Sequence, residues 1–215
     1  PSLSTSRFSA CSAEAPCLLS CIRTRQLWFI IGASLFLVVS GASRMNVENI
    51  TVLGSTGSIG QNTLDVIRRN PERFRVKALG AGSNVGKMFR DVKEFRPDVA
   101  VLADKDAALE LERLVRAEGD LGSVRVEGGY DVLSSIASLP DTDSVMAAIS
   151  GSAGLVPALA AIKAGKKIYL ANKESLIMTG HLFIDEARRS HSVILPVDSE
   201  HNAMFQCLPE SVQQS

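Results

Sequence analysis

Short apolar runs alternate with helix-length segments between residues 50 and 197, and this alternation constrains the fold more than any other feature of the chain. Each run has the length of a buried strand, and parallel strands need a crossover such as a helix between them. The alternation predicts an α/β fold: a Rossmann-like, doubly wound parallel sheet. The predicted strands are Ile50–Leu53, Phe74–Leu79, Asp98–Leu102, Ser123–Glu127, Val145–Ile149, Lys167–Ala171 and Val193–Val197. One predicted helix directly follows the first strand. The other predicted helices span Asn84–Phe95, Asp106–Glu118, Tyr130–Ser138, Leu155–Ala164 and Gly180–Ser190.

The first strand runs into a glycine-rich turn within the sequence TVLGSTGSIGQNTLDVI, Thr51 to Ile67. Beyond the turn, the spacing of one helical face is repeated by Gly60, Thr63, Leu64 and Ile67. A strand-to-helix turn points backbone N–H groups out of the helix N-terminus, and Gly54 and Gly57 have no side chains to obstruct a phosphate. The pattern favours a nucleotide site, although a tight turn without a ligand would use the same glycines.

Charge argues against a nucleic-acid partner. Lys plus Arg and Asp plus Glu each number 23, so the chain has no net basic charge to attract a polyanion. A small phosphorylated ligand remains compatible with this balance. Beyond Met45 the sequence contains only one cysteine, Cys207, which indicates a reducing compartment and predicts a cytoplasmic location.

Residues 1–44 differ in composition from the rest of the chain. They contain nine serines and four arginines but a single acid, Glu14. Within them Leu27–Val39 is almost wholly apolar, yet shorter than the roughly 20 residues of a membrane span. Three interpretations stay open. The segment is an artefact, either upstream sequence translated in error ahead of Met45 or the ragged start of a fragment; it is a leader that directs the protein to a plastid-type organelle; or it is a membrane or export signal.

Small and polar residues follow several predicted strands, where parallel α/β sheets bind their ligands. Gly82-Ser83-Asn84 contains no acid to hold the ribose 2′-hydroxyl of NAD, so it would tolerate the 2′-phosphate of NADP. Asn84 would equally well cap a helix. Asp198 and Glu200 lie two apart, so on an extended segment they would share a face and suit Mg²⁺ or Mn²⁺. A solvated turn explains an isolated pair of this kind as well.

Three longer stretches contain these patterns: LGSTGSIGQNTLDVIRRNPERFRVKALGAGSNV, MAAISGSAGLVPALAAIKAGKKIYLANKESL and ILPVDSEHNAMFQCLPESVQ. Together they closely resemble the 1-deoxy-D-xylulose 5-phosphate reductoisomerase family over residues 46–215. The resemblance implies an NADPH-dependent enzyme of the non-mevalonate isoprenoid pathway that requires Mg²⁺ or Mn²⁺. Such an enzyme rearranges its sugar phosphate and reduces the resulting aldehyde to 2-C-methyl-D-erythritol 4-phosphate.

The resemblance also implies roles for individual residues. Cofactor contacts are implied for the pyrophosphate turn of Thr56, Gly57, Ser58 and Ile59, for the 2′-phosphate loop of Gly82, Ser83 and Asn84, and for Asn172 and Glu174. Substrate contacts are implied for Lys173, Ser199 and Glu200, and metal ligation for Asp198 and Glu200. The catalytic residues implied in this way are Lys173, Asp198 and Glu200.

Two features depart from the family pattern. Some members have lysine at the position of Ser83, so a weaker grip on the 2′-phosphate is expected. The sequence also stops at Ser215, before the family's third carboxylate ligand, substrate-phosphate residues, mobile loop and C-terminal helical domain. We therefore expect a fragment that is inactive alone, a small sugar phosphate as substrate, and a homodimer at full length. The expected domains are a leader at 1–44, an NADPH-binding domain at 45–172 and an incomplete catalytic domain at 173–215.

Two other functions fit parts of the sequence. Another NADP oxidoreductase, such as a semialdehyde dehydrogenase, would share the glycine turn but needs a catalytic cysteine at a strand end. Cys207 instead falls in a predicted helix, where we expect it to pack. A non-catalytic, membrane-tethered NADP-binding module would use Leu27–Val39 as its anchor.

Overall fold

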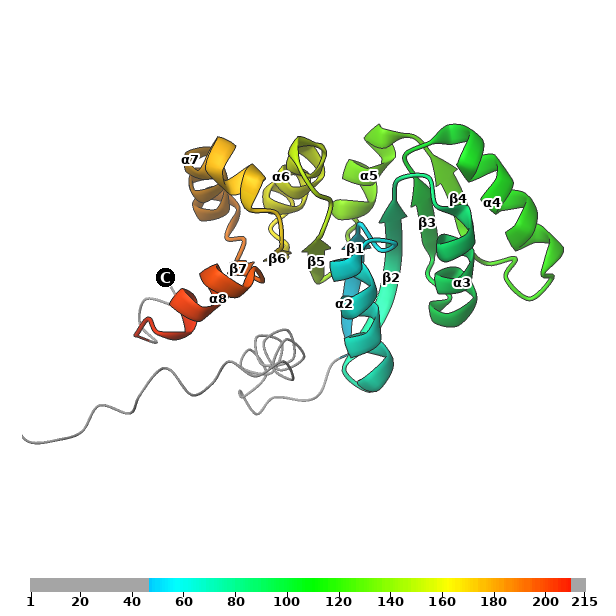
Figure 1. Cartoon of the computed structure of the whole chain (residues 1–215), viewed down its shortest axis with the longest axis horizontal. Helices are drawn as coiled ribbons and strands as arrows, with labels where there is room; N and C mark the ends of the chain where they lie inside the picture. The colour runs from blue at the N-terminus through cyan, green and yellow to red at the C-terminus, as the bar shows by residue number, and fades with distance from the viewer. Residues whose placement is uncertain (1–46, 210–215) are drawn as a thin grey trace, which may run out of the picture.

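The computed structural model describes residues 47–209, which form a single parallel sheet with helices on both faces (Figure 1). Its strands are β1 (Glu48–Leu53), β2 (Phe74–Ala81), β3 (Val99–Leu102), β4 (Arg125–Gly128), β5 (Ser144–Ala147), β6 (Lys167–Leu170) and β7 (Ile194–Pro196). Its helices are α2 (Ser58–Arg69), α3 (Val85–Phe95), α4 (Lys105–Ala117), α5 (Tyr130–Ala137), α6 (Leu155–Lys163), α7 (Lys173–Ser190) and α8 (Ser199–Gln206), with a 3₁₀ turn η1 (Ser152–Gly154) before α6. The predicted α/β fold with a doubly wound parallel sheet is confirmed.

The strand order β4-β3-β2-β1-β5-β6-β7 places a topological switch point between β1 and β5. From β1 the chain adds strands in one direction as far as β4, then returns through α5 to the other side of β1 and adds β5, β6 and β7 (Figure 1). The segments that leave β1 and β5 therefore diverge at the same edge of the sheet. Ligands bind at this position in open α/β sheets.

Apolar side chains on the two faces of the sheet form two core clusters. In one cluster, α2, α3 and α4 contribute Leu64, Met88 and Leu111. In the other, α5, α6 and α7 contribute Leu133, Ile162 and Phe183. Because helices cover both faces of the sheet, the inner strand β3 is buried throughout, and this explains why its sequence, VAVL, is a continuous apolar run. The edge strand β4 has no fully buried residue and includes Arg125 and Glu127.

Local sequence signals explain the buried face of α2 and the starts of α3 and α4. The predicted apolar face of α2 is confirmed, since its buried residues are Gly60, Thr63, Leu64 and Ile67. Asn84 and Asp104 cap α3 and α4 by accepting hydrogen bonds from the backbone N–H groups of Lys87 and Ala107.

Helix α7 begins at Lys173, not at the predicted Gly180. The Asn172 side chain accepts a hydrogen bond of 2.9 Å from the Ser175 N–H and so starts the helix immediately after β6. The backbone then departs from helical geometry at Thr179, where φ is −139°. The predicted helix Gly180–Ser190 is the segment after this kink, and the segment before it, which begins at Lys173, was not predicted.

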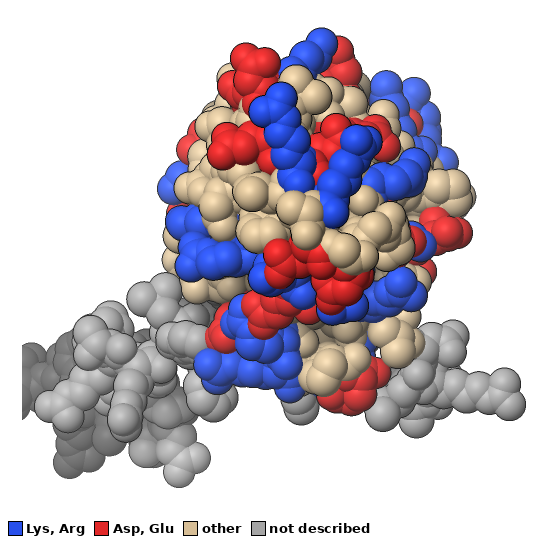
Figure 2. All heavy atoms as spheres, turned by 90° about the vertical axis from the view of Figure 1, so that its right-hand side faces the viewer, with Lys and Arg blue, Asp and Glu red and all other residues tan. Residues whose placement is uncertain are grey.

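Figure 2 shows the end of the molecule formed by α3, α4 and β4, where basic and acidic side chains are interleaved. Lys93 pairs with Glu118 and Arg96 pairs with Asp120 across this surface. This face therefore presents no large area of a single sign. Within residues 47–209, no helix combines the length and the apolar character needed to cross a bilayer. The apolar segment Leu27–Val39 lies outside the described residues.

Candidate functional site

The glycine turn between β1 and α2 lies at the switch point of the sheet. Gly54 has a positive φ of 81°, and a Cβ there would lie 2.4 Å from the carbonyl oxygen of Ala148. Gly54 is therefore required for the turn and for packing against the segment after β5. Gly54 thus has a packing role in addition to the phosphate access expected from the sequence, which stays a prediction for Gly54 and for the exposed Gly57.

The N-terminus of α2 has the properties of an anion site. Its N-cap residue, Gly57, makes no side-chain capping bond, and the first turn contains no acid. Ser58 is exposed beside it. The N–H groups of a helix's first turn have no intrahelical acceptors, and they carry the positive end of the helix dipole. These residues therefore fit a cofactor pyrophosphate.

Side chains from the neighbouring helices hold the carbonyl groups of the turn. Gln61 Nε2 donates hydrogen bonds of 2.9 Å to both the Ser55 carbonyl and Asp91 Oδ2. Burial raises the pKa of Asp91, and the hydrogen bond from Gln61 opposes this shift. The bonds tie the turn to α2 and α3, and sequence reasoning missed them because neither residue belongs to a recognisable motif.

The segment Gly82-Ser83-Asn84 follows β2, and all three residues are exposed. The alternative that Asn84 caps a helix is confirmed, since its Oδ1 accepts a bond of 3.0 Å from the Lys87 N–H. Capping occupies the side-chain oxygen and does not exclude a ligand at the exposed loop. The 2′-phosphate contacts of the three residues stay predictions.

Asn172 links the ends of β5 and β6. Its Nδ2 donates bonds of 2.6 Å to the Ile149 carbonyl and 2.8 Å to the Gly151 carbonyl, while its Oδ1 caps α7. The residue is 2% exposed. A Cβ at Gly154 would lie 2.5 Å from its Nδ2, so the glycine leaves room for the amide. The contact between Asn172 and a cofactor stays a prediction, and in this structure Asn172 positions the loop after β5.

Replacing Asn172 with aspartate is expected to lower the free energy of unfolding by about 2–4 kcal/mol, because a buried carboxylate oxygen would face two carbonyl oxygens. Chemical denaturation measures the change. Asn84→Asp is the matched control: it also converts a capping amide, but at an exposed helix N-terminus that favours negative charge, so stability should stay within about 0.5 kcal/mol. Equal effects of the two substitutions would contradict the role given to Asn172.

Lys173, Asp198 and Glu200 gather beyond the ends of β6 and β7. Lys173 Nζ lies 3.4 Å from Glu200 Oε1, and Ser199 Oγ lies 3.0 Å from Glu200 Oε2. The expectation that Asp198 and Glu200 share a face of an extended segment is wrong, because Asp198 is the N-cap of α8 and Glu200 lies in the first turn of that helix. Glu174 is exposed in the first turn of α7.

Electrostatics differ between the two carboxylates. Burial raises the pKa of Asp198, and the charge of Glu200 adds to the increase. Hydrogen bonds from its own backbone N–H, Ser199 and Lys173 lower the pKa of Glu200. Across residues 47–209, no three His, Cys, Asp or Glu side chains are grouped closely enough to hold a metal ion. The two carboxylates have the right chemistry for a hard cation, and further ligands must complete such a site.

Cys207 ends α8 and is exposed, so the expectation that it packs in a helix is wrong. Tyr130 was not singled out in the sequence, yet its hydroxyl donates a bond of 2.6 Å to the Ala153 carbonyl. This bond joins the start of α5 to the loop after β5.

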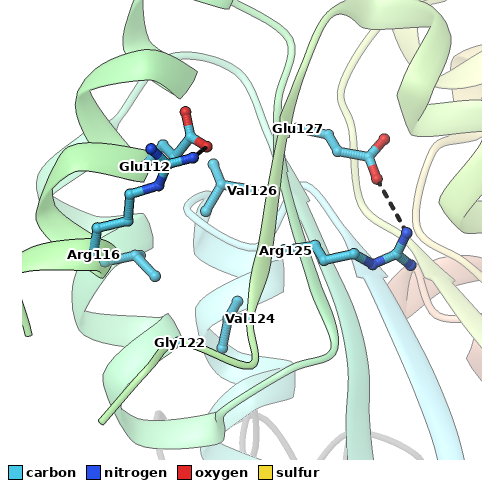
Figure 3. A pocket seen from close by; sticks show the side chains of 8 residues that line it. Glu112, Arg116, Gly122, Val124, Arg125, Val126 and Glu127 are labelled. Carbon is cyan, nitrogen blue, oxygen red and sulfur yellow. Dashed lines mark hydrogen bonds and ion pairs between the residues drawn. The ribbon is translucent and has the colours of Figure 1, made fainter. Parts of the chain in front are cut away.

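A cavity of about 340 Å³ lies at the β4 edge of the sheet, between α4 and β4 (Figure 3). Helix α4 contributes Glu112 and Arg116 to its wall, while β4 contributes an Arg125–Glu127 pair at 3.6 Å. Strands β2 and β3 separate β4 from β1. The cavity is therefore not part of the candidate site at the switch point.

Comparison with known proteins assigns the family. A model of the family described as 1-deoxy-D-xylulose 5-phosphate reductoisomerase matches residues 50–180, which is more than half of the 215 residues. The chain belongs to this family. The matched region begins in β1 and ends within α7, so it includes the glycine turn, the loop after β5 and Asn172.

Relatives of known family are similar in sequence and structure. The reductoisomerase of Aliivibrio salmonicida is 51% identical over 170 residues, which cover 78% of this chain and 42% of that protein. The reductoisomerase of Methylococcus capsulatus is 52% identical over 163 residues, covering 76% and 41%. A solved DOX-P reductoisomerase in complex with NADPH, fosmidomycin and magnesium has a TM-score of 0.75 at 43% identity, covering 79% of this chain and 41% of that chain. The Zymomonas mobilis reductoisomerase in complex with NADPH gives a TM-score of 0.72 at 44% identity, covering 77% and 42%. The chain thus spans about two fifths of the length of these relatives.

Proposed function

We propose that this chain is the NADPH-binding part, with the start of the catalytic part, of a 1-deoxy-D-xylulose 5-phosphate reductoisomerase. The reaction is the metal-dependent rearrangement and NADPH-dependent reduction of that sugar phosphate to 2-C-methyl-D-erythritol 4-phosphate, in the non-mevalonate isoprenoid pathway. One observation carries the proposal: the uncapped, acid-free N-terminus of α2 opens at the switch point of a parallel sheet, in a chain of this family. A solved reductoisomerase of similar structure is a complex with NADPH, fosmidomycin and magnesium, which supports the same cofactors here.

In this proposal the cofactor lies across the carboxyl ends of the strands. Thr56, Gly57, Ser58 and Ile59 bind its pyrophosphate, and the loop Gly82–Asn84 binds its 2′-phosphate. Residues 45–172 form the cofactor domain, and residues from 173 onward begin the catalytic domain. The acid-free loop after β2 supports NADP over NAD, because a carboxylate there would repel the 2′-phosphate.

The proposed catalytic group is Lys173, Asp198 and Glu200, with Ser199 as a further substrate contact. Asp198 and Glu200 would hold Mg²⁺ or Mn²⁺ together with ligands outside the described residues, and Lys173 would bind an oxygen of the substrate. When bound, the metal polarises substrate oxygens and NADPH supplies a hydride. The Lys173–Glu200 contact supports this assignment because it brings the ammonium group to the same strand ends as the carboxylates.

We also propose that the enzyme assembles as a homodimer. Helix α7 supports an interface on this side of the molecule: Ile177 is 80% exposed and Met178 is 60% exposed. Leu182 and Ile184 on the same helix are 43% and 46% exposed. Within residues 47–209 each of these four residues therefore leaves a large part of its surface uncovered, and a group of exposed apolar residues marks an interaction surface. Sedimentation of an enzyme of the relatives' full length measures the assembly state.

Titration of this chain tests the cofactor assignment. We expect NADPH to bind at least about tenfold more tightly than NADH, because the exposed loop offers donors and no acid to the 2′-phosphate. Ser58→Asp places a carboxylate in the first turn of α2, so it should lower the affinity for both cofactors by about tenfold or more while slightly stabilising the fold. Fluorescence titration and thermal unfolding measure the two effects. If Ser58→Asp binds both cofactors as tightly as the wild type, the pyrophosphate does not bind at this turn.

A further inference from the structure

Lys87 lies between the two loops that the proposed function gives to the cofactor. It occupies the first turn of α3, directly after Gly82–Asn84, and its backbone N–H is held by Asn84. Its side chain turns toward the glycine turn, where Nζ donates a hydrogen bond of 3.2 Å to the Thr56 carbonyl. One side chain thereby spans the pyrophosphate turn and the loop after β2.

The Lys87 ammonium is suited to a phosphate in this position. An ammonium group has three donors, and the bond to Thr56 uses one of them. The side chain is half-buried, which reduces screening of its charge by water. Gly82, Ser83 and Asn84 contribute no charge of their own to the exposed loop.

The carboxylates nearby in the fold are already bound by other groups. Asp104 donates its backbone N–H to the Gly82 carbonyl at 3.2 Å, but its side chain caps α4 at the Ala107 N–H. Asp91, on the same helix as Lys87, is buried and accepts from Gln61. Neither carboxylate is paired with Lys87.

We propose that Lys87 is the residue that selects NADPH over NADH, by placing its ammonium group against the 2′-phosphate of the adenosine ribose. The inference rests on the proposed function. In this inference the positive charge that pairs with the 2′-phosphate comes from a residue on α3, whereas the loop itself supplies neutral donors. An interaction with the pyrophosphate is the competing possibility, and it would serve both cofactors equally.

Calorimetric titration of the full chain with NADPH and with NADH tests the assignment. Lys87→Gln keeps a donor for the Thr56 carbonyl and removes the charge, so NADPH affinity should fall about tenfold or more while NADH affinity stays within about twofold. Lys87→Arg should keep most of the NADPH affinity. Lys93→Gln is the matched control on the same helix, since Lys93 pairs with Glu118 away from both loops, and it should leave both affinities unchanged.

The outcomes separate this inference from the proposed function. Unchanged NADPH affinity in Lys87→Gln, or equal losses for NADPH and NADH, would overturn the assignment while leaving a dinucleotide site in place. A wild-type chain that binds neither cofactor would overturn the proposed function and this inference with it. A second pair of probes, adenosine 2′,5′-bisphosphate and AMP, isolates the phosphate: only the bisphosphate should lose affinity in Lys87→Gln.

Discussion

Replacing Gly60 with alanine is expected to lower the free energy of unfolding by about 3 kcal/mol or more, and to remove cofactor binding with it. A Cβ at this position would lie 2.2 Å from the Gly54 carbonyl oxygen and 2.6 Å from the Ser55 Cα. Both atoms belong to the backbone of the glycine turn, so no side chain can rotate to relieve the contact. Helix α2 would have to move away from β1, and the turn would lose its shape.

Gly86→Ala is the matched control for this prediction. Gly86 is also a helical glycine, in the first turn of α3, but a Cβ there would have nothing within 4 Å. Alanine at an exposed helical position should stabilise the protein by about 0.5–1 kcal/mol, because it reduces the backbone entropy lost on folding. Chemical denaturation of both variants measures the contrast. A Gly60→Ala protein as stable as the wild type would show that the strand-to-helix turn tolerates displacement and does not fix the site.

The parts of the fold that could be predicted from sequence are those decided by local periodicity. The buried face of α2 follows from its spacing, and the N-cap of α3 follows from a residue with a short polar side chain. The alternation of buried strands with helices was sufficient to predict a parallel sheet. These features need no knowledge of which segments meet in space.

The parts that could not be predicted depend on contacts between distant segments. The helix Gly180–Ser190 was expected, but the segment of α7 before the kink at Thr179 was not. Asn172 starts that segment with a capping bond while binding carbonyls of the loop after β5. The position of Gly54 against Ala148 depends in the same way on β5 lying beside β1. In both cases a residue first considered for ligand contact serves to join two strand ends.

The features of the candidate site also divide into those that sequence could predict and those that depend on contacts between distant segments. The glycine turn and the acid-free loop could be identified from sequence because each is a continuous motif. The bonds that hold them, from Gln61 and Lys87, join α2 and α3 to the turn and have no sequence signature. The contact between Lys173 and Glu200 bridges two helices, and only the resemblance to a known family suggested that both residues belong to one site.

Replacing Asp198 with asparagine is expected to lower turnover by about 100-fold or more in an enzyme of the relatives' full length, for example this chain continued with the C-terminal sequence of the Methylococcus capsulatus relative. Asparagine keeps the shape of the side chain and removes the negative charge that a divalent cation requires. The change also removes a carboxylate whose pKa is raised by burial, so the fold should tolerate it. NADPH affinity should change little, because the α2 N-terminus is separate from α8.

Steady-state turnover at the Mn²⁺ concentration that saturates the wild type and at higher concentrations, measured together with NADPH affinity, distinguishes the possible roles of Asp198. Asp185→Asn is the matched control: its carboxylate is 67% exposed on α7, and its loss should leave both quantities unchanged. Turnover of Asp198→Asn close to that of the wild type would exclude Asp198 as a metal ligand. A parallel collapse of NADPH affinity would mean that Asp198 supports the fold through its position at the N-terminus of α8. A loss of turnover alone, partly restored by a higher Mn²⁺ concentration, is the result that metal ligation requires, because the remaining ligands bind the ion more weakly.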